Sequence, residues 1–217
     1  MIVLGFDETN NGFGLKCFNE NHQSNLIITG YLASDLPMKN YQRPSNEVKG
    51  KLFDGNRNLQ SALRRGRDYL SKHPDFLYTS VSKELQRVKP IELLHAEAVA
   101  LLTTNFFLRY SLNPNETKVI MDERDGKNPS NKINQLLDLW LKKTGINIIH
   151  KSMKSAADNV YSVRKADMVG YYLTAIHFLG YNHKWPYRSR RVSFNRLEKD
   201  ITLFQENNGN RQFDYRN

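Results

Sequence analysis

The feature that most constrains this chain is a regular alternation of helical and strand-like segments after residue 90. Pro90 is well placed as a first-turn residue of a helix whose apolar residues follow helical spacing at Ile91, Leu94, Ala98, Leu101, Leu102 and Leu108. The pattern then predicts a strand at 118–121, a helix at 129–143, a strand at 146–149 and a helix at 158–179. Alternation of this kind predicts parallel strands covered by helices.

The first part of the chain has a different pattern. Short apolar runs at 2–6, 13–18 and 25–32 are separated by polar turns, which predicts a meander of antiparallel strands. We therefore expect an α/β fold with a mixed five-stranded sheet, first antiparallel and then parallel, with helices on both faces. Residues 1–200 are expected to form one domain with an inserted segment at about 34–89, which holds one basic helix near 58–71, and residues 201–217 a polar tail.

Net charge and cysteine content limit the binding partners and the cellular location that we expect for this chain. The 217 residues carry 32 Lys and Arg against 22 Asp and Glu, a net charge of +10 that makes nucleic acid a plausible partner. Cys17 is the single cysteine, which argues against disulfides and for a cytoplasmic location. The longest apolar stretches are broken before the roughly 18 residues that a membrane span needs, so no membrane partner is expected.

Two aspartates close predicted strands. Asp7 follows the first strand and Asp122 follows the fourth. If these strands are parallel neighbours, both carboxylates emerge at the edge where α/β sheets place their ligand sites. Each aspartate taken alone is also compatible with ordinary turn chemistry.

Two further acids interrupt apolar helix faces. Glu97 lies three residues after Leu94 and four before Leu101, and Asp167 lies four after Val163 and four before Tyr171. An isolated buried carboxylate is costly, so each needs a partner. Glu97 alone could equally pair with a buried Lys or Arg. Two Mg²⁺ or Mn²⁺ ions would explain all four acids together.

Two other acids are additional candidates. Glu8 points to the opposite strand face from Asp7 and joins the site only if the strand ends between them. Asp158 is either a helix N-cap or, if the helix starts later, a ligand.

Basic residues cluster in two segments that are candidates for nucleic-acid contact: Arg64, Arg65 and Arg67, and Lys184, Trp185, Arg188, Arg190 and Arg191. A charge run is usually a solvated face. The second segment, however, interleaves aromatic and basic side chains, which suits backbone contact and base stacking.

The order of elements and acids resembles the ribonuclease H-like superfamily. The opening Gly5-Phe6-Asp7-Glu8-Thr9 is similar to the Asp-Glu start of type 2 ribonucleases H, although Thr9-Asn10-Asn11-Gly12 replaces their Ala-Gly-Arg-Gly. The pair Ala166-Asp167 also matches the end of a Leu-Gln-x-Ala-Asp signature in an uncharacterised prokaryotic family that starts Asp-Glu-Ser-Gly. The resemblance implies that Asp7, Glu97, Asp122 and Asp167 are metal-binding catalytic acids.

The resulting expectation is a metal-dependent nuclease that hydrolyses RNA or an RNA:DNA hybrid. The alternative is a non-catalytic nucleic-acid-binding protein with the same fold. The two differ in whether the carboxylates perform chemistry or only stabilise the fold.

Overall fold

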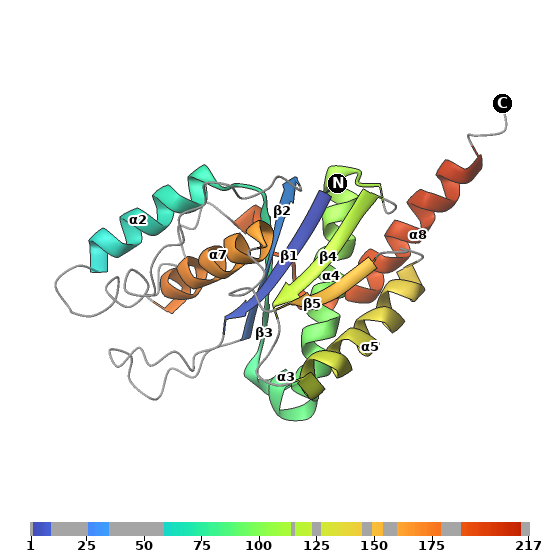
Figure 1. The fold of residues 1–217 in the computed structure, drawn as a ribbon, viewed down its shortest axis with the longest axis horizontal. Helices are drawn as coiled ribbons and strands as arrows, with labels where there is room; N and C mark the ends of the chain where they lie inside the picture. The colour runs from blue at the N-terminus through green and yellow to red at the C-terminus, as the bar shows by residue number, and fades with distance from the viewer. Residues whose placement is uncertain are drawn as a thin grey trace.

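One mixed sheet organises the chain (Figure 1). The computed structural model describes residues 2–9, 26–34, 59–113, 116–122, 127–144, 149–153, 160–178 and 188–213. Within them the strand order is β3-β2-β1-β4-β5. The strands span Ile2–Thr9 (β1), Leu26–Ser34 (β2), Phe76–Val81 (β3), Thr117–Asp122 (β4) and Ile149–Met153 (β5).

The strand directions divide the sheet into two parts. β2 pairs antiparallel with both β1 and β3, whereas β4 runs parallel to β1 and β5 runs parallel to β4. The expectation of a mixed α/β sheet with helices is therefore confirmed. The predicted strand at 13–18 lies outside the described residues, and so do residues 146–148 of the predicted strand at 146–149.

β3 comes from the segment that was assigned to an insertion at about 34–89. Its sequence is rich in strand-forming residues. Pro74 and the polar helices on each side make the surrounding sequence irregular, so this strand was not predicted. The short helix that follows is α3, Lys83–Val88. The predicted basic helix in this segment is present as α2, Leu59–Lys72.

Helices cover both faces of the sheet (Figure 1). One face packs against α4 (Ile91–Tyr110), which α5 (Lys127–Thr144) and α8 (Leu197–Phe213) cover in turn. The other face packs against α7, Tyr161–Phe178, with α2 outside it. The helices predicted at 129–143 and 158–179 agree with α5 and α7 within a few residues.

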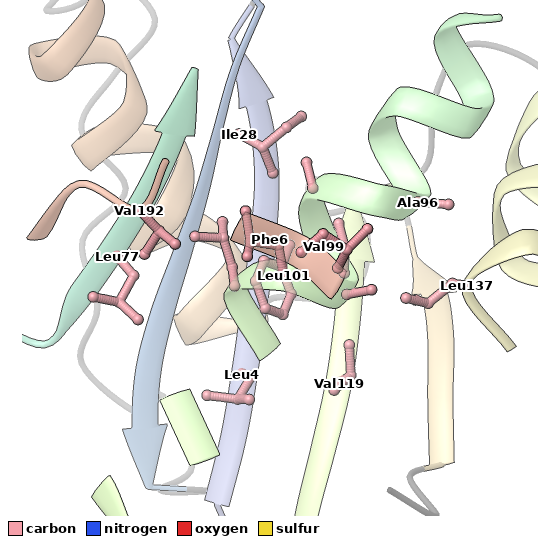
Figure 2. Close-up of a cluster of buried hydrophobic side chains, with 14 of the residues drawn as sticks. Leu4, Phe6, Ile28, Leu77, Ala96, Val99, Leu101, Val119, Leu137 and Val192 are labelled. Carbon is pink, nitrogen blue, oxygen red and sulfur yellow. The ribbon is translucent and has the colours of Figure 1, made fainter. Parts of the chain in front are cut away.

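α4 is the central helix of the larger core. Leu4 and Phe6 of β1 meet its side chains there, and the rings of Phe6 and Phe106 form an edge contact at 6.3 Å (Figure 2). By length and composition α4 could cross a membrane, but 78% of its most apolar window is buried inside the protein, as in a core helix. Burial of this kind explains why the helix is apolar on every side.

The last described segment is helical where a polar tail was expected from residue 201. α8 continues to Phe213, and its Ile201 and Phe204 are buried, with Phe204 in edge contact with Phe107 of α4. Two short 3₁₀ turns precede it, η3 (Arg188–Arg190) and η4 (Phe194–Arg196). Only a few apolar residues pack this helix against the core. The other residues are polar, which is why the sequence predicted a tail and not a helix.

Candidate functional site

β1 and β4 bring two of the predicted acids to one edge of the sheet. The parallel register pairs Phe6 with Met121, so Asp7 and Asp122 are the next residues on neighbouring strands. Adjacent strands lie about 4.8 Å apart. Asp7 is 7% exposed and Asp122 is partly exposed. The condition that these two strands are parallel neighbours is met, but the prediction that the first strand ends before Asp7 is wrong, because β1 continues to Thr9.

Side-chain alternation places both acids on the α7 face. Leu4 and Phe6 belong to the core under α4, and so do Val119 and Met121 on the neighbouring strand. Because successive side chains of a strand point to opposite faces, Asp7 and Asp122 lie on the other side. This is the face that α7 covers.

A glycine allows α7 to approach this face closely. A Cβ atom at Gly5 would collide with the backbone of Ser162 and Val163 in the first turn of α7. Asp167 follows about one turn later and is partly exposed. Asp167 therefore lies on a helix that contacts β1 at Gly5, and Gly5 is two residues before Asp7.

Glu97 has a different environment. Its side chain is 7% exposed, and both of its carboxylate oxygens lie 3.1 Å from the Nζ of Lys89, just before α4. This is the ion-pair alternative that its sequence position left open. Among the described residues, no three His, Cys, Asp or Glu side chains gather as a metal-binding group.

Glu8 lies on the α4 side of the sheet, where it meets a histidine. Its Oε2 is 3.0 Å from Nδ1 of His95, and the side chains are 17% and 3% exposed. The strand continues past Glu8, so Glu8 and Asp7 keep opposite orientations. Nothing in the local sequence identifies His95 as the partner, because the two residues belong to different elements.

The predicted basic residues are only partly described. Arg67 and Arg191 are exposed, and Arg190 is half-buried with its Nη1 donating to the hydroxyl of Tyr110 at 2.9 Å. Arg188 begins η3. The positions that fall outside the described residues or side chains are Asp158, Arg64, Arg65, Lys184, Trp185 and the side chain of Arg188.

Sequence reasoning missed a buried amine on α7. Lys165 is 4% exposed, its Nζ lies 2.9 Å from Nε2 of His73, and it sits over the rings of Tyr69 and Tyr161 at 5.0 and 5.2 Å. Burial lowers the pKa of Lys165 to about 8. Burial, and then the charge of Lys165, lower the pKa of His73. Lys165 lies among apolar residues in the sequence of α7, which is a weak signal that the position is buried.

Comparison with known proteins finds similarity in structure but none in sequence. No family model matches the chain, and no curated protein matches it in sequence. In structure it is similar to the ribonuclease H2 from Pyrococcus horikoshii OT3, with 13% sequence identity and a TM-score of 0.46. The match covers 88% of this chain and 81% of that chain.

Proposed function

We propose that this protein is a metal-dependent nuclease that hydrolyses phosphodiester bonds of RNA or an RNA:DNA hybrid. The observation that carries the proposal is the placement of Asp7 and Asp122 on one face of the sheet, each one residue beyond Phe6 and Met121, the last parallel pair of two neighbouring strands. Two carboxylates that begin at adjacent positions of neighbouring strands repel each other unless a cation lies between them. The net charge of +10 supports a polyanionic substrate.

The donor set fits a hard divalent cation. Asp7 and Asp122 would hold Mg²⁺ or Mn²⁺, with water and phosphate oxygens as the remaining ligands. Among the described residues, Asp167 does not join them as a third acid of one metal-binding group. When bound in pairs, such ions activate a water and stabilise the leaving oxygen of a phosphodiester. The low exposure of Asp7 keeps bulk water away from its carboxylate and strengthens its attraction for a cation.

The other two acids take supporting roles in this proposal. Lys89 already neutralises Glu97, so Glu97 serves the fold rather than the metal. Oε2 of Glu8 lies 3.0 Å from Nδ1 of His95 without hydrogen-bond geometry, on the α4 side of the sheet. This close approach brings the start of α4 next to the last residues of β1.

A cleavage assay tests the proposal. End-labelled RNA, DNA and RNA:DNA hybrid are incubated with the protein and either Mg²⁺, Mn²⁺ or EDTA. We expect cleavage only with metal, and a loss of more than about 100-fold in Asp7→Asn and Asp122→Asn. The matched control is Asp138→Asn on the exposed side of α5, which should cleave normally. No cleavage by folded wild-type protein under any condition would overturn the proposal.

A non-catalytic nucleic-acid-binding protein is the second candidate, and one observation favours it. The ion pair of Lys89 and Glu97 removes an acid that the family resemblance assigns to the metal. In this case the protein binds labelled nucleic acid in a salt-dependent manner, and Asp7→Asn leaves that binding unchanged or tightens it. Absence of turnover with Mn²⁺, together with such binding, would select this candidate.

A further inference from the structure

The end of α4 and the segment 188–196 hold arginines together at the surface. Nη1 of Arg109 donates to the backbone oxygen of Ser189 at 2.7 Å, and Nη1 of Arg190 donates to the hydroxyl of Tyr110 at 2.9 Å. Both contacts join the end of α4 to η3. We call the group formed by Arg109, Arg190 and Arg196 the arginine surface.

The segment that carries Arg190 is fixed to the sheet. The backbone N–H of Val192 donates to the oxygen of Tyr78 at 2.8 Å, and Oγ1 of Thr79 donates to the oxygen of Val192 at 2.8 Å. Val192 itself is 3% exposed and belongs to the core under α4. The arginine surface therefore rests on a rigid support, which lowers the entropy cost of binding a ligand.

The third arginine is paired with Asp200, a carboxylate of α8. Arg196 donates from Nη2 and Nε to Oδ1 of Asp200 at 2.9 and 3.2 Å. The other oxygen, Oδ2, accepts from Nδ2 of Asn105 at 2.8 Å, and Asp200 is fully buried. Both oxygens of Asp200 are thus engaged inside the protein.

The guanidinium charges influence one another. Burial lowers the pKa of Arg109, and the charges of Arg190 and Arg196 lower it further, against the opposing effects of Tyr110 and Asp200. Three cations face one carboxylate, so the surface carries surplus positive charge. Arg109 is exposed, and the Arg196 side chain is 53% exposed, so an anion can reach them. Guanidinium groups bind phosphate through paired hydrogen bonds.

The arginine surface lies away from the two aspartates. Glu8 meets His95 near the start of α4, whereas Arg109 lies near its end, roughly 21 Å along the helix at 1.5 Å per residue. Asp7 and Asp122 lie on the opposite face of the sheet from α4, so the arginine surface is a site separate from their edge.

We infer that the arginine surface binds backbone phosphates of a nucleic acid, at a site separate from the Asp7 and Asp122 edge. The choice of nucleic acid rests on the proposed function, whereas the surplus charge does not depend on it. The role is backbone contact, so binding should depend strongly on salt and little on base sequence.

Fluorescence anisotropy tests the inference without any cleavage. A labelled RNA:DNA hybrid of 20 base pairs is titrated with protein in EDTA at several KCl concentrations. Replacing both Arg109→Gln and Arg190→Gln should weaken binding at least about fivefold and reduce the salt slope by about 2, one for each lost phosphate contact. Lys132→Gln, an exposed lysine on α5, is the matched control and should change neither quantity.

Two further variants separate charge from structure. Arg109→Lys with Arg190→Lys keeps both charges and should restore the salt slope. Tyr110→Phe removes the anchor of Arg190 without changing charge, so the slope should persist. The inference would be overturned if the variant with Arg109→Gln and Arg190→Gln had the same salt slope for hybrid binding as wild type. It would also be overturned if this variant bound the hybrid normally and lost binding only to vesicles that contain phosphatidylserine.

The outcomes remain distinct from those of the cleavage assay. If wild-type protein never cleaves but the Gln variant loses salt-dependent binding, the inference holds and the nuclease proposal fails. If wild-type protein cleaves and the Gln variant binds normally, the nuclease proposal holds and the inference fails.

Discussion

Lys89 holds Glu97 with its Nζ 3.1 Å from both carboxylate oxygens. The pair joins the residue before Pro90 to the second turn of α4, and Glu97 is nearly inaccessible while Lys89 is 40% exposed. Glu97 is thus neutralised by a side chain of its own chain. Under the proposed function, the acids that would hold a metal are Asp7 of β1 and Asp122 of β4.

Removal of this lysine tests the ion pair. Lys89→Met leaves a buried carboxylate without its cation, so the free energy of unfolding should fall by about 1–3 kcal/mol. Glu97→Gln added to that variant should recover part of the loss, because the amide carries no charge. The control Lys132→Met breaks a 3.9 Å surface contact with Glu92 and should cost less than about 0.5 kcal/mol. Urea unfolding measures all of these, and full stability in Lys89→Met would exclude the pairing role.

Substitution of Gly5 tests the close contact of α7 with β1. In Gly5→Ala the new methyl group meets the backbone of Ser162 and Val163, which cannot rotate away. The unfolding free energy should fall by about 1–3 kcal/mol or more. Thermal unfolding followed by circular dichroism measures this. An unchanged melting temperature would show that α7 does not approach β1 as described.

The buried carboxylate of α8 gives a third prediction. Asp200→Ala leaves Arg196 and Asn105 without their shared acceptor, and the loss of a buried ionic partner costs about 3–5 kcal/mol. Glu198→Ala, on the exposed side of the same helix, should cost less than about 0.5 kcal/mol. Equal stability of the two variants in urea unfolding would contradict the arrangement of α8 against α4.

The pH dependence of stability follows from His73. Burial and Lys165 lower its pKa in the folded protein below the ordinary value of 6.5. As the pH falls below 6.5, the unfolded chain takes up a proton that the folded protein resists, so stability decreases over that range and is fully present above it. Urea unfolding between pH 5 and pH 8 in His73→Gln should show a smaller decrease. The same pH dependence in wild type and variant would exclude His73 as its source.

Much of the fold could be predicted because its helices carry regular apolar spacing. α4, α5 and α7 lie within a few residues of the expected segments. β3 and α8 could not, because β3 stands between polar flanks and α8 docks through scattered apolar residues such as Ile201 and Phe204. The spacing of apolar residues reveals a helix or strand that buries a whole face. It does not reveal one that is held in place by a few apolar side chains.

The site shows the same division. The adjacency of Asp7 and Asp122 could be predicted, because parallel neighbouring strands place residues at equivalent positions side by side. The partners of Glu97 and Glu8 could not, because Lys89 precedes α4 and His95 lies on a different element from Glu8. The distinction between a metal ligand and an ion pair depends on such partners from outside the element that carries the acid.

The most direct test of the central claim is calorimetric titration of the protein with Mn²⁺. Wild-type protein should bind the ion, and Asp7→Asn and Asp122→Asn should each lower the affinity by at least about tenfold while the protein stays folded. Equal Mn²⁺ affinity in wild type and both variants, or no binding by folded wild-type protein, would contradict the claim that these two aspartates hold a cation together.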